Sequence, residues 1–477
     1  MKGAGKHNEV GPRSKEIFEL EGRHMAPGLQ SFALYSGLAM ARGRGSRLHD
    51  EDGNEYIDFI AGIAVGSVGH CHPHYVQRLK EQVENLTFGS FTTEVRAKFL
   101  ELLGSVTPPG LTRVSLFSGG AEAVEAAFRL AKSATGKHEF LGFTGAFHGK
   151  TGGVLPLLWG DFKKGLGPFT PGCYSAPYAY CYRCPLALTY PDCGLACAEK
   201  ARGVIRDQTS GALAAVIIEP MQGTAGNVIP PPGFLPAIQS VAKDHGALLI
   251  ADEMITGFGR TGRMWGVDHD GIVPDVMTVG KGVGGGFPLA GLVSTDALTA
   301  HPPFSNPSGS SSSYGGNPLA SAAGLASLEI ITRENLVENS RRVGEAMLGR
   351  LRQMQEKHRV IGDVRGKGLL LGLELVKDRA TRELVSKNDT KRLFQECLRR
   401  GLVAMSYTPI IRINPPLNTD EATALEGLDL RPSCGPFWQA SMPGTKGACC
   451  YCRGDSTAII IRLLRKEPGP SGPDDCR

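Results

Sequence analysis

The chain has 477 residues, of which 41% are hydrophobic and 21% charged, as expected for a large globular protein of two or three domains. The net charge of +5 comes from 52 basic and 47 acidic residues spread along the chain, which argues against a nucleic-acid or anionic-membrane partner. Residues 1–16 lack the apolar region of a secretory signal, and no apolar stretch reaches the roughly 18 residues of a membrane span. We therefore expect a cytoplasmic protein.

The chain begins with an arm and part of a small domain, over residues 1–60. The sequence predicts a short helix at 14–21 and two strands within 47–59, joined by a turn at Asp52-Gly53-Asn54. From about residue 96 to 328 short apolar runs alternate with amphipathic stretches, which indicates an α/β fold with a mostly parallel sheet. We assign this pattern to a large domain over residues 61–330. Its clearest strands are predicted at 114–117, 214–218, 247–251 and 276–279.

A smaller α+β domain is predicted over residues 331–429. We expect helix through residue 357, one strand over 366–375, a helix near 391–400, a strand near 410–413 and a helix from Glu421 past Glu426. Residues 430–477 have no helical or strand period and carry five of the 12 cysteines. Their spacing fits no tetrahedral metal pattern, so we interpret them as an atypical Cys/Pro/Gly-rich tail, poorly ordered or read in a shifted frame.

Three of the predicted strands are followed directly by charged residues. Glu219, Asp252 and Lys281 each come after one of these apolar runs. The carboxyl ends of parallel strands meet at one edge of a sheet, where ligands bind, so the two acids and the lysine can reach one crevice. An acid and a lysine suit a cofactor with a basic ring nitrogen and an aldehyde. Each residue alone is more often an ordinary surface group; the combination carries the hypothesis.

A phosphate site is predicted between the strand at 114–117 and the helix that follows it. There Gly119 and Gly120 let the backbone approach an anion, and a helix N-terminus offers unpaired N–H groups. A Gly-Gly turn also caps ordinary helices, so this signal is weak by itself.

Six segments in chain order resemble the class III pyridoxal-phosphate (PLP) aminotransferases, the ornithine, 4-aminobutyrate and ω-amino acid enzymes. The likeness runs from about residue 38 to 428 and implies a PLP-dependent transferase of fold type I. The segments are Ser118-Gly-Gly-Ala-Glu-Ala-Val-Glu125, Gly145-Ala-Phe-His-Gly149, Ile218-Glu-Pro220, Asp252-Glu-Met-Ile-Thr-Gly-Phe-Gly-Arg-Thr-Gly262, Gly280-Lys-Gly282 and Tyr314-Gly-Gly-Asn-Pro318.

This resemblance also implies roles for single residues. Lys281 is similar to the Schiff-base lysine and Asp252 to the partner of the pyridinium nitrogen, the two catalytic residues. Arg412 is similar to an arginine that grips a substrate carboxylate, for which a planar guanidinium is suited. The remaining cofactor-binding positions are the phosphate cradle Gly119, Gly120 and Ala121, the ring-stacking Phe147 with His148 beside it, the more distant acid Glu219, and Ser313. In the family the position of Ser313 reaches the neighbouring subunit's cofactor, which implies a homodimer, or a tetramer, with shared active sites.

Three positions depart from the family pattern. Thr224 stands where ornithine and 4-aminobutyrate enzymes usually carry a glutamate that pairs with the carboxylate-binding arginine. Ile255 replaces a common Gln and Val124 a common Asn. We therefore expect Thr224 to contact the substrate. Without the glutamate, its usual pairing with the arginine is missing. The residues thus support the reaction class better than they support a particular substrate.

A cysteine-rich insert holds Cys181, Cys184, Cys193 and Cys197. Two close pairs separated by eight residues could bind zinc or an iron–sulfur cluster. The looser second pair and the neighbouring prolines favour reduced structural thiols over a metal, and a cytoplasmic protein would not keep stable disulfides.

The function that best fits these features is ping-pong transamination. We expect an amino group to move from an ω-amino acid or amine, 4-aminobutyrate-like, to a 2-oxo acid, with no metal. Two alternatives remain. The same fold also supports amino-acid racemases, epimerases and dialkylglycine decarboxylases. A non-catalytic, metal-binding regulatory protein would account for the cysteines but not for Asp252 and Lys281.

Overall fold

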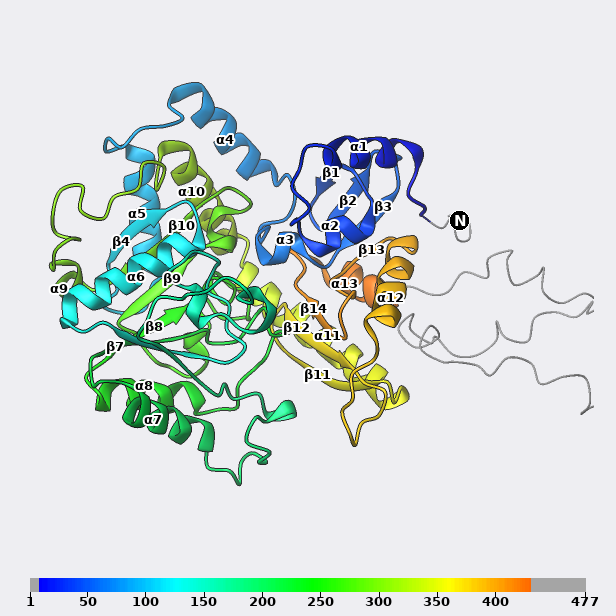
Figure 1. Cartoon of the computed structure of the whole chain (residues 1–477). Helices are drawn as coiled ribbons and strands as arrows, with labels where there is room; N and C mark the ends of the chain where they lie inside the picture. The colour runs from blue at the N-terminus through cyan, green and yellow to red at the C-terminus, as the bar shows by residue number, and fades with distance from the viewer. Residues whose placement is uncertain (1–7, 430–477) are drawn as a thin grey trace, which may run out of the picture.

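The computed structural model describes residues 8–429, and the predicted tail at 430–477 lies outside this range. A seven-stranded sheet forms the centre of the larger lobe, and two smaller sheets lie beside it (Figure 1). The strand order of the large sheet is β4-β10-β9-β8-β7-β5-β6. Its strands are β4 (Arg113–Phe117), β5 (Glu139–Phe143), β6 (Cys173–Ala176), β7 (Leu213–Ile218), β8 (Leu248–Asp252), β9 (Val276–Val279) and β10 (Ala290–Ser294).

Only β10 runs against its neighbours in this sheet. It pairs antiparallel with β4 and β9, whereas the pairs among β5 to β9 are parallel. This arrangement confirms the predicted α/β class with a mostly parallel sheet, in which the carboxyl ends of β7, β8 and β9 lie at one edge.

Helices cover both faces of the large sheet, and β7 shows how. Its residues Val216 and Ile218 enter one apolar cluster, whereas Ala215 and Ile217 enter another. Successive side chains of a strand point to opposite faces, so a strand buried on both faces reads as a continuous apolar run. Helices α6 (Gly120–Thr135), α7 (Ala196–Gln208) and α8 (Phe234–Asp244) contact strands of the sheet, and α4 (Pro73–Asn85) and α5 (Glu94–Val106) pack against α10 (Pro318–Arg333).

The second lobe joins the two ends of the described chain. A four-stranded sheet, β1-β2-β3-β13, pairs N-terminal strands with β13 from beyond residue 400, and β13 is parallel to β3. The third sheet, which we call the C-terminal sheet, is antiparallel in the order β11-β12-β14. The strands are β1 (Met40–Arg44), β2 (Arg47–Asp50), β3 (Glu55–Asp58), β13 (Leu402–Val403), β11 (Ile361–Lys367), β12 (Leu370–Leu375) and β14 (Ile410–Ile413). The helices of this lobe are α1 (Pro12–Gly22), α2 (Ser31–Ser36), α3 (Ala61–Ala64), α11 (Leu336–Lys357), α12 (Lys387–Arg399) and α13 (Glu421–Asp429), whereas the short α9 (Asp296–Thr299) contacts α6 in the larger lobe (Figure 1).

The single strand predicted at 366–375 is wrong in one respect. The segment 361–375 forms two antiparallel strands, β11 and β12, with Lys367 paired to Leu370. Gly368 makes the tight turn between them with φ +53°, a conformation that glycine adopts without strain. The turn is hidden in the sequence because apolar residues continue directly after it.

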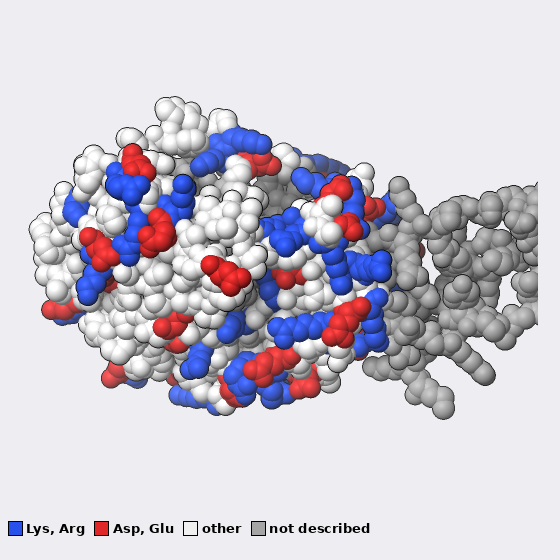
Figure 2. Space-filling view, turned by 90° about the horizontal axis from the view of Figure 1, so that it is seen from below, with Lys and Arg blue, Asp and Glu red and all other residues white. Residues whose placement is uncertain are grey.

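Among residues 8–429 no helix is both long and apolar enough to cross a membrane. Figure 2 shows basic and acidic side chains interspersed over one face of the molecule. This face therefore offers a polyanion no continuous basic surface.

Candidate active site

Three adjacent parallel strands carry the charged residues of the site. Glu219 follows β7, Asp252 ends β8, and Lys281 follows β9 after Gly280. Asp252 pairs in register with Thr278 of β9, so the lysine comes three residues after the position opposite the acid. The predicted convergence at one sheet edge follows from this register.

Asp252 is buried and held by three groups. His148 Nδ1 lies 2.6 Å from Asp252 Oδ2, while the Thr278 hydroxyl and the Met254 N–H donate to Oδ1 at 3.0 and 3.2 Å. Burial by itself would lower the pKa of His148, but the hydrogen bond and charge of Asp252 raise it above its ordinary value. His148 Nε2 is buried and has no hydrogen-bond partner within residues 8–429.

Lys281 occupies a strained backbone position. Its φ is +44°, in the left-handed region that residues other than glycine rarely adopt and that often marks a functional site. Burial lowers the pKa of Lys281, the charges of Asp252 and Glu219 act in the opposite direction, and Arg412 adds to the lowering. The side chain makes no hydrogen bond or ion pair within the described chain, so its amine is free to react.

Glu219 ties two loops of the site together. Its Oε1 accepts from the N–H of Phe147 at 2.9 Å, and its Oε2 accepts from the N–H of Gly223 at 3.0 Å. Burial raises the pKa of this carboxyl group, and the charge of His148 opposes the rise. Glu219 therefore fixes the predicted ring-stacking residue relative to the loop that carries Thr224.

The N-terminus of α6 lies where the phosphate cradle is predicted. Gly119 is the residue that precedes the helix, and its N–H donates to Glu122 Oε2 at 2.7 Å, which leaves the next N–H groups at the helix start for an anion. The backbone packs closely here: a Cβ at Gly120 would lie 3.0 Å from Met254 Sδ, and one at Gly149 would lie 2.9 Å from Ala121 Cα.

Two predicted cofactor residues lie farther out. Phe147 is partly buried and packs edge-on against Phe162 at 5.3 Å between ring centroids. Ser313 is exposed in the loop before α10. Its exposure is what a residue that serves a neighbouring subunit requires.

Arg412 lies near the Tyr407 hydroxyl and forms no ion pair within the described range. Burial lowers the pKa of Arg412, and Tyr407 opposes that effect. Thr224 lies half-buried in the loop after Glu219, and Ile255 packs into a small apolar cluster whose members are Ala64, Met221 and Leu370. An arginine without an acidic partner can receive a carboxylate from a substrate.

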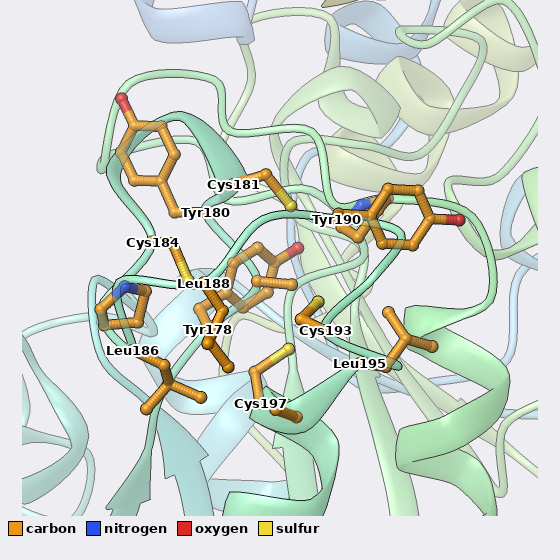
Figure 3. A pocket seen from close by; sticks show the side chains of 14 residues that line it. Tyr178, Tyr180, Cys181, Cys184, Leu186, Leu188, Tyr190, Cys193, Leu195 and Cys197 are labelled. Atoms are coloured by element: carbon orange, nitrogen blue, oxygen red, sulfur yellow. The ribbon is translucent and has the colours of Figure 1, made fainter. Parts of the chain in front are cut away.

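The four insert cysteines line one small pocket (Figure 3). Cys181, Cys184, Cys193 and Cys197 surround it together with apolar side chains and Tyr178. All four are free thiols, and no cluster of three or more His, Cys, Asp or Glu in the described part of the chain is arranged to hold a metal ion. Burial raises the pKa of Cys181 to about 11, which keeps this thiol protonated.

Sequence reasoning missed the groups that hold Asp252. Thr278 and Met254 were not singled out, although Thr278 lies inside a predicted strand, directly opposite the acid. Periodicity predicts that Thr278 faces one side of the sheet, but not which neighbouring strand lies beside it.

These residues fit pyridoxal phosphate. The helix start of α6 suits the phosphate, Phe147 the ring, the buried Asp252 the protonated ring nitrogen, and Lys281 the aldehyde. A mostly parallel sheet with this set at its carboxyl edge defines a PLP-dependent transferase of fold type I.

Comparison with known proteins identifies the family. The profile of the family "Aminotransferase class-III" matches residues 33–430, and the chain belongs to this family. The chain is 37% identical over 406 residues to a 4-aminobutyrate aminotransferase of Mycobacterium tuberculosis, covering 82% of this chain and 89% of the relative. It is 32% identical over 424 residues to a leucine/methionine racemase of Thermococcus litoralis, covering 87% and 94%.

Solved structures agree with this assignment. A thermostable (S)-enantioselective ω-transaminase from Thermomicrobium roseum superposes with a TM-score of 0.80 at 30% identity, covering 88% of this chain and 98% of that one. The protein is therefore a PLP-dependent enzyme of the class III aminotransferases.

Proposed function

We propose that this aminotransferase moves an amino group from an ω-amino acid or amine, 4-aminobutyrate-like, to a 2-oxo acid by a ping-pong mechanism. The observation that carries the proposal is that Asp252 and Lys281 lie at the ends of adjacent parallel strands, that the charge of Arg412 acts on Lys281, and that Arg412 forms no ion pair within residues 8–429. Transamination needs an electron sink, a base and a carboxylate anchor, and these three residues match those needs.

Bound pyridoxal phosphate supplies an aldehyde that exchanges amino groups and a ring that withdraws electrons. Asp252 holds a proton on the ring nitrogen, and His148, Thr278 and the Met254 N–H orient its carboxylate. Lys281 Nζ takes the proton from the substrate carbon that bears nitrogen, and its lowered pKa keeps more of the amine neutral for this task. Arg412 holds the substrate carboxylate, with Thr224 beside it.

We also propose that the enzyme works in the cytoplasm as a homodimer whose sites are shared through Ser313. The exposed position of Ser313 supports this arrangement. We further propose that the domains of the chain are divided near residues 60, 330 and 429.

A half-reaction tests the proposed transamination. Holoenzyme is mixed with 4-aminobutyrate, ornithine, alanine or a simple primary amine, without any 2-oxo acid, and the cofactor absorbance is followed. We expect an ω-amine to convert the cofactor to its amine form. If no donor does so, the proposed reaction is wrong.

A second function is favoured by two observations. Thr224 replaces the usual glutamate, and one relative, similar over 87% of this chain, is a leucine/methionine racemase. The alternative is therefore racemisation or epimerisation of an α-amino acid, or decarboxylation of a dialkylglycine. Exchange of the α-proton with solvent deuterium, or release of carbon dioxide, without net amino transfer would establish it.

A further inference from the structure

One face of the C-terminal sheet brings two arginines to the loop that follows Glu219 and carries Thr224, which we call the substrate loop. Arg365 of β11 pairs in register with Gly372 of β12, which pairs in turn with Arg412 of β14. Residues directly opposite one another on neighbouring strands place their side chains on the same face. The two arginines therefore flank a glycine that has no side chain.

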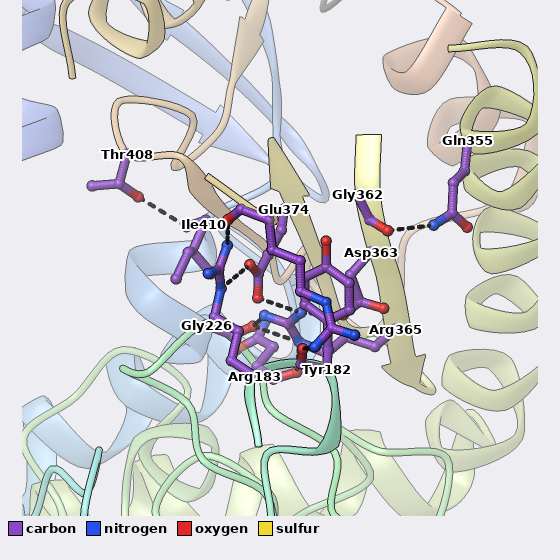
Figure 4. Close-up of polar contacts among 12 residues, drawn as sticks. Tyr182, Arg183, Gly226, Gln355, Gly362, Asp363, Arg365, Glu374, Thr408 and Ile410 are labelled. Carbon is purple, nitrogen blue, oxygen red and sulfur yellow. Dashed lines mark hydrogen bonds and ion pairs between the residues drawn. The ribbon is translucent and has the colours of Figure 1, made fainter. Parts of the chain in front are cut away.

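The space over this glycine is filled by the loop that carries Thr224. A Cβ at Gly372 would lie 2.5 Å from the carbonyl oxygen of Gly226. Arg365 Nη2 donates to that oxygen at 2.7 Å, and its Nε donates to the carbonyl of Asn227 at 3.1 Å (Figure 4). The planar guanidinium thus holds two successive carbonyls of the loop at once.

A buried ion-pair chain orients Arg365. Its Nη1 lies 3.0 Å from Glu374 Oε1 and also pairs with Asp363, and Arg183 Nε lies 2.6 Å from Glu374 Oε2. The Glu374 side chain has no exposed surface, and a buried carboxylate requires such partners. Arg183 belongs to the cysteine-rich insert, so the insert and the substrate loop meet on the same sheet face.

We propose that Arg365 is a positioning residue for substrate recognition, which sets the place of the Thr224 loop relative to Arg412 and is itself oriented by Arg183 through Glu374. This inference rests on the proposed function, in which Arg412 and Thr224 contact the substrate. Thr224 is uncharged and cannot form an ion pair with Arg412. The loop that carries Thr224 therefore needs another residue to fix its position. A displacement of about 1 Å in a binding site is enough to change rates by orders of magnitude.

Arg365→Lys tests whether Arg365 fixes the position of the loop that carries Thr224. Lysine keeps the charge but cannot direct hydrogen bonds to both carbonyls and to Glu374. We expect KM for 4-aminobutyrate to rise about tenfold and kcat to stay within about threefold. KM for butylamine, in which a methyl group replaces the carboxylate, should change less than about twofold, and the absorbance of the bound cofactor should not change. If Arg365 had a merely structural role, KM for both substrates would change by the same factor.

Gly372→Ala displaces the same loop by a different route. The added Cβ meets the Gly226 oxygen, while the strand itself tolerates alanine. We expect the same selective rise in KM for 4-aminobutyrate. Arg379→Lys is the matched control, because Arg379 also donates to backbone carbonyls of the same lobe, at Ile361 and His358, but not to the loop. It should change neither KM by more than about twofold.

Arg412→Lys separates this inference from the function on which it rests. If it raises KM for 4-aminobutyrate selectively, while Arg365→Lys and Gly372→Ala affect both amines equally or neither, the positioning role is overturned and the proposed substrate site stands. If Arg412→Lys is not selective, the substrate site is wrong and the inference is overturned with it. A selective effect in all three variants supports both.

Discussion

Single residues in this site are held by their neighbours in unusual states. Lys281 is forced into left-handed backbone, and Asp252 collects three donors, one of them the buried His148. Both features cost conformational or desolvation free energy, which the fold has to offset elsewhere. Such concentration of strain and buried charge is what a reactive centre requires.

Lys281→Ala removes the amine that we propose as base and cofactor anchor. We expect kcat to fall by at least about 1000-fold, since general acid–base and covalent contributions are both lost. Steady-state kinetics with the best donor checks this, and absorbance after dialysis shows whether cofactor still binds. Lys137→Ala, at a lysine bonded to the carbonyls of His245 and Gly246, is the control. A loss smaller than about tenfold would contradict the assigned role.

Glu253 has a different role from its neighbour Asp252. It is fully buried and accepts from the N–H groups of Gly266 and Val267, both at 2.9 Å, and from the Thr256 hydroxyl. Adjacent strand positions point to opposite sides, so only Asp252 faces the site. Glu253 stabilises the turn that follows.

Glu253 makes stability depend on pH. Burial raises its pKa from 4.5 to about 7, so its contribution is fully present below pH 4.5 and is lost as the pH rises through about 7, a loss of about 3 kcal/mol. Glu253→Gln does not titrate. We expect the thermal midpoint of the variant, relative to wild type, to rise by about 3 to 5 °C between pH 5 and pH 8. A difference that is constant over this range would contradict the raised pKa.

Elements were predictable wherever a local pattern marked them. The strands β4, β7, β8, β9 and β14 lie where apolar runs predicted them, and β7 and β9 are buried on both faces, which gives such a run its distinct composition. The β11–β12 hairpin was read as one strand, since Gly368 turns the chain within an apolar stretch. The apolar residues that follow Gly368 directly hide the turn from a reading of local periodicity.

The start of α6 is set by contacts with a separate loop. Gly149 has φ +115°, and a Cβ there would press on Ala121 in the first turn of the helix. Gly149→Ala should strain the loop by about 1 to 3 kcal/mol and displace the phosphate cradle. We expect the Kd for pyridoxal phosphate to rise about tenfold, as measured by fluorescence titration. Gly152→Ala, where nothing lies within 4 Å of the added Cβ, should leave Kd unchanged. Equal changes of Kd in both variants would contradict the prediction.

At the scale of the whole molecule, large apolar side chains remain uncovered. Phe88, Phe91 and Tyr314 are 75%, 87% and 73% exposed, far more than isolated surface aromatics usually are. Tyr314 directly follows Ser313, the residue expected to serve a second subunit. We expect these side chains to lie in the subunit interface of the proposed homodimer.

Phe91→Asp should disrupt this interface, because a buried unpaired carboxylate opposes association. By light scattering we expect wild type at about twice the chain mass of 50.8 kDa and the variant near the single-chain mass, with transamination largely lost. Val273→Asp, at another exposed apolar residue, is the control. A variant that stays dimeric would place the interface elsewhere.

The sequence by itself determined the fold class, the strand ends that bear Glu219, Asp252 and Lys281, and the glycine turn of the phosphate cradle. These features are local, so composition and spacing record them. Only the tertiary structure decided that Asp252 is held by His148 and Thr278, and that Arg365 and Arg412 flank Gly372. Asp252 lies 104 residues from His148 and 26 from Thr278, and strand order and register, which no local period encodes, bring such partners together.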